Sequence, residues 1–232
     1  MRLRAAASVT VLVLAAALLG LVYQTGSPTR IRLDMVAVSI GDRLLLVSRH
    51  EVSIAEWQLC YDDGGCSFNP KPGPGAAGTN FPVTGVNWFD VNEYLAWSRQ
   101  NSDLQLRLPT LAEWNMIAQD VPLARQKKLF TDPRLAWAAN YSTTAIPPRL
   151  KTSGSFKPSQ NGIADLSGNV WEWTMTCVSS SFTDQDAERC PAYIAAGEHE
   201  ATIPVFVRDP ANGGCAVGAP PAHLGFRLVV EG

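Results

Sequence analysis

The run GNVWEWT, Gly168 to Thr174, places two tryptophans around Glu172, directly after a Gly-Asn turn. Asp165 lies shortly before the turn, so two carboxylates and a large aromatic area fall in one short segment. Aromatic side chains bury a large apolar area with defined geometry, and their polar edges usually find hydrogen-bond partners. The pattern therefore predicts a rigid aromatic platform that also holds something polar.

A second set of residues with chemical potential is the cysteines, of which the chain has five: Cys60, Cys66, Cys177, Cys190 and Cys215. Disulfides form and persist in exported proteins, and an odd number of cysteines leaves one unpaired. The first two flank YDDGG, a segment that could close a small loop, and the next two flank the polar run VSSSFTDQDAER. On proximity, Cys215 would be the free thiol, although every other pairing stays open.

The composition and charge limit the kinds of protein that this chain can be. The chain has 232 residues, 46% of them hydrophobic and 17% charged, which suits one globular domain of about 200 residues and an appendage. The formal net charge is −2 and no basic block is present, so a nucleic-acid partner is excluded. No GxSxG, GxxxxGK[ST] or GxGxxG motif occurs, which argues against those acyl-transfer, phosphate-binding and dinucleotide-binding sites.

The appendage is the N-terminus. Arg2 and Arg4 precede an uncharged run, Ala5 to Tyr23, that is long enough to cross a bilayer as a helix. The run ends in LVYQTG, a poor match to a cleavage site, so residues 1–24 are interpreted as an uncleaved signal anchor. The basic residues predict a cytoplasmic N-terminus, which gives a single-pass protein of the bacterial inner membrane with its domain in the periplasm. The alternative is a cleaved signal peptide and a protein secreted to the periplasm.

Local signals place the elements that position these residues. After a linker at residues 25–30, apolar alternation and the turn at Gly41 predict a β-hairpin within residues 31–47. Capping motifs predict three short helices, from Ser53 to about Cys60, from Asn87 to about Gln100 and from Thr110 to about Gln119. Proline and glycine make residues 69–82 and 140–157 loops. Without a regular βαβ rhythm, the pattern indicates an α+β fold with much irregular backbone.

Four segments in order closely resemble the sulfatase-modifying-factor family, whose members are formylglycine-generating-enzyme-like domains. They are PVTGVNWFDVNEYLAW, LRLPTLAEWNMIA, NGIADLSGNVWEWT and HLGFRLV. The resemblance assigns residues 31–232 to such a domain. It implies a loop-rich variant of the C-type-lectin-like fold, preceded here by one N-terminal membrane helix.

The resemblance also implies a calcium site. In the family, the segment that matches Asp165 to Glu172 holds the ion, and here the two carboxylates with the carbonyls of Gly168 and Val170 would be its ligands. Calcium takes six to eight oxygen ligands, so these residue types suit it. The structural alternative is that Asp165 caps a turn and Glu172 is a solvated strand residue. Relatives have a second calcium site near the segment that matches Asn140 and Tyr141, but its other ligands do not align clearly here.

Relatives that make formylglycine carry RGGSWxCxxSYC near the C-terminus, where two cysteines bind copper(I), an ion that soft thiolates suit. The corresponding region here has Cys215 alone, so the copper-dependent oxidase reaction is not supported. Cys215 could still be a redox or copper centre with an imidazole of His50, His199 or His223, or simply be buried or disulfide-bonded. Relatives also often have a disulfide cysteine at Cys177, paired with one that resembles Cys190.

Two arginines, Arg107 of RLP and Arg227 of GFR, lie within apolar sequence, where a guanidinium requires carboxylate or carbonyl partners. They would either clamp an anion in a cavity or form internal ion pairs, and their place in the fold-defining motifs favours ion pairs. Glu113 is better explained by its helix terminus than by acid–base catalysis.

Three functional hypotheses follow. The first is a membrane-anchored maturation or accessory factor for a protein or peptide client, without the copper dithiolate. The ending GGCxxGxPxxHLGFRL also resembles accessory proteins found with copper nitrite reductases. The second is an oxidoreductase of the same family that uses Cys215 to modify a peptidyl or small-molecule substrate. The third is a lectin-like binding module stabilised by calcium, although fold alone does not imply sugar binding.

Overall fold

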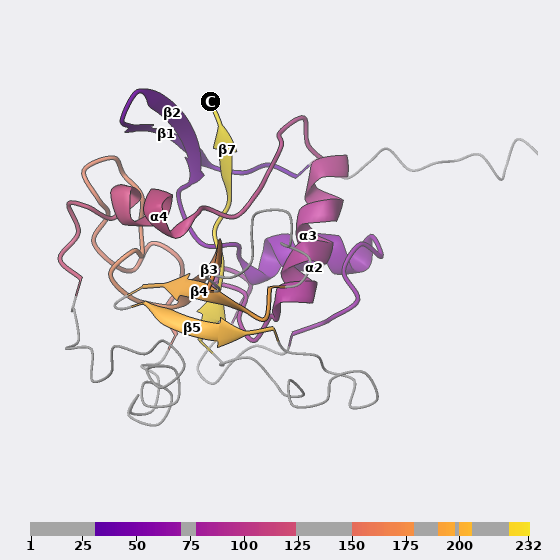
Figure 1. Cartoon of the computed structure of the whole chain (residues 1–232). Coiled ribbons are helices and arrows are strands. Elements are labelled where there is room, and N and C mark those ends of the chain that lie inside the picture. Colours follow the sequence, from indigo (N-terminus) through magenta and orange to yellow (C-terminus); the bar gives the residue numbers. More distant parts are fainter. Residues whose placement is uncertain (1–30, 71–77, 124–149, 179–189, 198–199, 206–222) are drawn as a thin grey trace, which may run out of the picture. The chain divides into compact units, whose positions relative to one another are not determined.

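The computed structural model describes residues 31–70, 78–123, 150–178, 190–197, 200–205 and 223–232. These residues form an α+β fold with two small sheets and three helices (Figure 1). The predicted anchor, residues 1–24, and the linker, residues 25–30, lie outside this described part. Within it, no helix has the length and apolar character needed to span a membrane.

The first sheet begins with the predicted hairpin, which is confirmed. Strand β1 (Met35–Ile40) pairs antiparallel with β2 (Arg43–Ser48), and the turn between them contains Gly41 at φ +60°, a left-handed conformation that glycine adopts without strain. The third strand, β7 (Val229–Glu231), comes from the end of the chain and pairs antiparallel with β2. The hairpin is therefore joined to the C-terminus (Figure 1).

The second sheet has the strand order β5-β4-β3-β6. Strands β3 (Trp171–Cys177), β4 (Ala192–Ala196) and β5 (Ala201–Pro204) form an antiparallel meander. The short β6 (Leu224–Gly225) adds to β3 in parallel. Since β6 lies in this sheet and β7 in the other, the three residues between them carry the chain from one sheet to the other.

The three helices begin at the predicted capping motifs, and each motif forms a full capping box. They are α2 (Ile54–Asp62), α3 (Trp88–Gln100) and α4 (Leu111–Ile117). Helix α4 ends two residues before the predicted boundary at Gln119, because the chain turns at its C-cap, Ala118. Helices α2 and α3 pack against each other (Figure 1).

Aromatic packing connects the helices to the C-terminal segment. Trp57 of α2 stacks on Tyr94 of α3 with ring centroids 5.5 Å apart, and Phe226 meets both rings edge-on. The indole N–H of Trp57 donates to the carbonyl of Phe68 at 2.9 Å. All three rings are almost completely buried, so Phe226 fixes the end of the chain within the main core.

Two disulfides are present and confirm the pairing expected from proximity. Cys60–Cys66 closes the turn after α2, and Cys177–Cys190 joins the end of β3 to the chain just before β4. Cys215 lies outside the described residues, as do Asn140 and His199. Bridges of this kind restrict the unfolded chain and so stabilise a loop-rich domain.

An ion-pair network holds α4 to the C-terminus. Both terminal nitrogens of Arg107 donate to the Glu113 carboxylate, at 2.7 and 2.8 Å, and one also donates to Glu231 at 2.6 Å. The backbone N–H of Thr110 also donates to Glu113. Burial alone would raise the pKa of Glu113, but the hydrogen bonds from Arg107 and Thr110 outweigh it and lower the pKa to about 2.

Glu113 should therefore make the fold acid-sensitive. Its pKa in the folded state lies below the ordinary value of 4.5, so its contribution is complete above about pH 5 and is lost as the pH falls towards 2. We expect Glu113→Gln, which keeps the capping box, to lower the free energy of unfolding at pH 7 by roughly 2 to 3 kcal/mol and to flatten its decline below pH 5. Urea unfolding at several pH values measures both effects.

The matched control is Asp42→Asn, because Asp42 is an exposed carboxylate in the turn between β1 and β2. Its unfolding free energy should change by less than about 1 kcal/mol. Parallel pH curves for wild type and Glu113→Gln would contradict the assigned role.

Candidate functional site

The aromatic turn of GNVWEWT carries Glu172 into the centre of the domain. Trp171 and Trp173 flank it on β3; the Trp173 N–H donates to the carbonyl of Val86, and the Trp171 ring packs edge-on against His223 at 4.6 Å. A Cβ on Gly168 would lie 2.5 Å from the Phe156 ring, so only glycine permits this close approach. The platform predicted from the sequence exists, and Glu172 is 1% exposed within it.

Arg227 is the polar partner of Glu172. It is fully buried, and its Nε and Nη2 donate to the two carboxylate oxygens at 2.6 and 2.5 Å, the planar bidentate arrangement that guanidinium favours. Arg227 also donates to the carbonyls of Ser48 and Ala164 at 3.2 and 3.1 Å. Burial lowers the pKa of Arg227, but Glu172 outweighs it and raises the pKa, so the guanidinium is charged.

Asp165 is held by the backbone of a neighbouring loop. Its Oδ2 accepts from the N–H of Gly154 at 2.5 Å and its Oδ1 from the N–H of Phe156 at 3.0 Å. Asp165 itself has φ +65°, a conformation that Asp and Asn tolerate better than most residues. The carboxylate therefore fastens the loop of residues 152–156 to the aromatic turn.

These contacts test whether the predicted ligands suit calcium. Every carboxylate oxygen of Asp165 and Glu172 accepts at least one N–H hydrogen bond, and a guanidinium lies directly on Glu172. The carbonyl of Gly168 accepts from the N–H of Val170 at 3.1 Å. A cation shared by the two carboxylates would have to compete with these donors and with the charge of Arg227, so the hydrogen bonds disfavour a calcium ion bound by both.

A third buried carboxylate, Glu51, was not singled out by the sequence analysis. It is 1% exposed, and neither of its side-chain oxygens has a hydrogen-bond partner. Burial raises the pKa of Glu51 well above its usual value; Arg227 lowers it, while Glu172 and Asp165 raise it further. The available signal was its position, an acidic residue between the apolar end of the hairpin and the Ser53 capping box.

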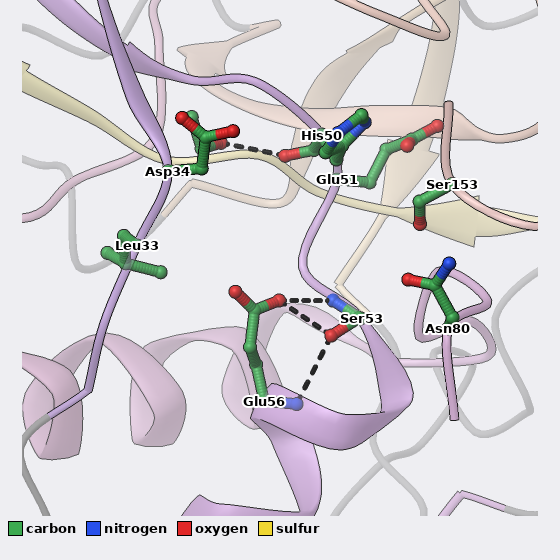
Figure 2. Close-up of a pocket in the computed structure, with 9 residues that line it drawn as sticks. Leu33, Asp34, His50, Glu51, Ser53, Glu56, Asn80 and Ser153 are labelled. Atoms are coloured by element: carbon green, nitrogen blue, oxygen red, sulfur yellow. Dashed lines mark hydrogen bonds between the residues drawn. The ribbon is translucent and has the colours of Figure 1, made fainter.

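Glu51 lines a pocket of about 100 Å³ (Figure 2). The pocket lies between the segment before β1, the β2–α2 connection, the first turn of α2 and two loops. Its lining residues are Leu33, Asp34, Ser48, His50, Glu51, Ser53, Glu56, Asn80 and Ser153. His50 also lies 3.6 Å from Asp165, so the pocket and the aromatic turn adjoin each other.

The structure places the other predicted site residues separately. Cys215 lies outside the described residues, so its position relative to His50 and His223 is not described. Arg107 belongs to the network on α4, whereas Arg227 lies at the centre of the domain. Both arginines pair with carboxylates. Within the described residues, no group of three or more His, Cys, Asp or Glu side chains is arranged to hold a metal ion.

Comparison with known proteins gives the family. The family model described as the sulfatase-modifying factor enzyme 1-like domain matches residues 31–232, most of the chain. The chain belongs to this family. The resemblance drawn from RLPT, GNVWEW and GFR is thereby confirmed, and these motifs correspond to the α4 network, the aromatic turn and the buried arginine.

Relatives include both active and inactive enzymes by name. The formylglycine-generating enzyme of Streptomyces coelicolor is 31% identical over 115 residues, which cover 44% of this chain and 34% of that enzyme. The inactive C-alpha-formylglycine-generating enzyme 2 of Bos taurus is 29% identical over 167 residues, 62% of this chain and 53% of the relative. The chain thus spans about a third to about half of the length of these relatives.

Among solved structures, Treponema denticola variable protein 1 resembles the chain with a TM-score of 0.55 and 18% identity. The match covers 90% of this chain and 99% of that one. At this identity the likeness concerns the fold alone.

Removing Arg227 should be strongly destabilising. Arg227→Met would leave Glu172 buried without its counter-charge, and we expect the free energy of unfolding to fall by about 3 to 5 kcal/mol. The double variant Arg227→Met, Glu172→Leu should recover part of this loss, because neither charge is then buried alone. Urea unfolding followed by tryptophan fluorescence measures each variant.

Arg43→Met is the control, because Arg43 is exposed and its ion pairs are long, at 3.3 and 3.4 Å. Its effect should stay below about 1 kcal/mol. A loss for Arg227→Met as small as that of Arg43→Met would refute the central role of the pair.

Calcium stays a prediction of the family resemblance, and chelation tests it. Since every oxygen of the two carboxylates accepts an N–H, we expect EGTA to leave the melting temperature unchanged and Asp165→Ala to act equally with or without calcium. A melting temperature that falls with EGTA and returns with added calcium in the wild type, but not in Asp165→Ala, would show that calcium binds at Asp165 despite these hydrogen bonds. Circular dichroism in matched buffers gives the measurement.

Proposed function

We propose that the protein is an exported, membrane-anchored accessory factor that binds a protein client during the client's maturation. In this proposal the domain keeps the family scaffold and works without the copper-dependent oxidase chemistry of active relatives. The N-terminal anchor holds the domain at the periplasmic face of the bacterial inner membrane. The domain then acts on clients that reach the same compartment.

The supporting observation is the state of the cysteines. Copper(I) in the active enzymes is bound by a pair of thiolates, and soft thiolate ligands are what this ion prefers. Four of the five cysteines form the disulfides Cys60–Cys66 and Cys177–Cys190. Only Cys215 remains, so the chain cannot supply a copper dithiolate from its own free thiols.

Relatives of this chain include proteins named as inactive enzymes, such as the bovine protein described above. A scaffold retained without catalysis therefore has precedent among proteins similar to this chain. The lectin-like fold implied by the resemblance presents long loops on a rigid core, and loops of that kind commonly carry binding residues. Client binding requires no further chemistry.

The identity of the client is a narrower proposal. The ending GGCxxGxPxxHLGFRL resembles accessory proteins of copper nitrite reductases, so we propose that enzyme as the client. The competing proposal is an oxidoreductase with Cys215 as its redox or copper centre, and it is favoured by the single unpaired cysteine. A calcium-stabilised lectin-like module is a third reading, which the hydrogen bonds on Asp165 and Glu172 disfavour.

Complementation separates the first two proposals. In a bacterium that carries this gene and a copper nitrite reductase, we expect deletion to lower nitrite reductase activity severalfold. Cys215→Ser should restore the wild-type level, because an accessory factor does not use the thiol chemically. The measurement is nitrite reduction by periplasmic extracts together with the copper content of the purified reductase.

Alkylation without reduction, read by mass spectrometry, should first verify that Cys215 is the thiol that reacts. Immunoblots must show equal amounts of wild type and Cys215→Ser. If Cys215→Ser is equally abundant but does not restore nitrite reduction, the oxidoreductase proposal is favoured. If deletion leaves nitrite reductase activity unchanged, the copper nitrite reductase is excluded as the client.

A further inference from the structure

The pocket beside the buried ion pair contains buried polar atoms without a hydrogen bond, although one of them, Nδ1 of His50, also lies 3.6 Å from Asp165. Both side-chain oxygens of Glu51, Nδ1 of His50 and Oγ of Ser153 are buried and form no hydrogen bond with the protein. All three residues line the same pocket. A buried polar group without a partner costs about 1 to 3 kcal/mol, so atoms that the protein itself leaves unsatisfied in one pocket favour the binding of a hydrogen-bonding group there.

The charge around the pocket is acidic. Asp34, Glu51 and Glu56 all line it, and the Asp34 carboxylate is already paired with Arg49 at 2.7 Å. Glu56 belongs to the capping box of α2, where its Oε2 accepts from both the N–H and the hydroxyl of Ser53 at 2.7 Å. Both bonds end on Oε2, which leaves Oε1 able to accept a further donor.

The residues approach the pocket from opposite sides. Figure 2 shows Ser53 and Glu56 on one side and His50 and Glu51 on the other, with Asn80 and Ser153 at the edge. The N–H of Ser153 donates to the carbonyl of Asn80 at 2.9 Å, which ties the two loops together there. Figure 2 shows the Glu51 carboxylate on the side of Ser153 and the Glu56 carboxylate beside Ser53, so the two acidic groups line different parts of the same pocket.

A metal ion fits this pocket poorly, because within the described residues no three His, Cys, Asp or Glu side chains are arranged around a common ion. What the carboxylate oxygens lack is a hydrogen-bond donor, and a primary ammonium group has three N–H donors and a positive charge. The volume of about 100 Å³ admits such a group with water, since one water needs only about 10–15 Å³.

We propose that this pocket binds a primary ammonium group, either of a lysine side chain on a polypeptide or of a small amine. The charge of Glu56 and the acceptors Glu51 and Ser153 would recognise it. If the ammonium group belongs to a lysine of a polypeptide, the inference rests on the proposed client-binding function. Binding of an ammonium group as such does not depend on that function. The test uses purified protein and is therefore independent of the complementation experiment.

The first measurement is the melting temperature of the full chain in detergent, titrated with n-butylammonium chloride at constant ionic strength. We expect a saturable rise with a dissociation constant on the order of 1 mM, as suits a ligand of so few atoms. n-Butyltrimethylammonium has the same charge and chain without N–H donors and should give no saturable rise. Equal effects of the two cations, or none from either, would overturn the proposal.

The variants locate the effect. Glu56→Gln removes the charge and keeps the capping box, so it should weaken binding about tenfold or more without loss of folding. Glu51→Gln should also weaken binding. If Glu51→Gln does not fold, the result for Glu56→Gln decides the test. Asp42→Asn, an exposed control outside the pocket, should bind as wild type does. Wild-type affinity in Glu56→Gln would refute the site.

Binding experiments with two peptides distinguish the two sources of the ammonium group. The probe is acetyl-Gly-Lys-Gly-amide, compared with the same peptide carrying norleucine in place of lysine. Binding of the lysine peptide more tightly than n-butylammonium indicates a polypeptide ligand, and weaker binding indicates a small amine. The norleucine peptide must not bind if the ammonium group is what the pocket recognises.

Discussion

The buried pair of Arg227 and Glu172 is the interaction on which the rest of the domain depends. Burying a guanidinium away from water costs much free energy unless its N–H donors have partners. Here the donors of Arg227 bind a carboxylate on β3 and carbonyls from two other segments. The strand β3, the end of β2 and the loop before the aromatic turn must therefore meet at one point. The two sheets are oriented around this charge, and the pocket lined by Glu51 lies beside it.

Local features of the fold could be predicted because their causes are local. The hairpin follows from alternation and a glycine turn, and the three helices begin where Ser53, Asn87 and Thr110 form capping boxes. Strand pairings between distant segments leave no comparable pattern in the sequence. The β2–β7 pairing joins residues far apart in the chain, and the β3–β6 pairing involves a strand of two residues.

The candidate site shows the same limit. From their proximity in the sequence, Glu172 and Asp165 were expected to share a ligand. In the structure Glu172 instead pairs with Arg227, which is 55 positions away. Asp165 instead bonds to the backbone of a loop. The burial of Glu51 could not be read from its neighbours, because it depends on loops from other parts of the chain closing over it. Motif recognition identified the family correctly, but only the folded arrangement shows which partner each charge has.

The last nine residues contribute a strand to both sheets, and Phe226 and Arg227 lie between these strands. Within the domain, this segment follows every other strand, so a refolding chain that forms its hairpin and helices first must still recruit it before Glu172 meets a guanidinium. Contacts between residues far apart in the chain form slowly, because loop closure costs entropy before the contacts compensate for it. The two sheets are therefore expected to be completed in the same late, cooperative step of folding.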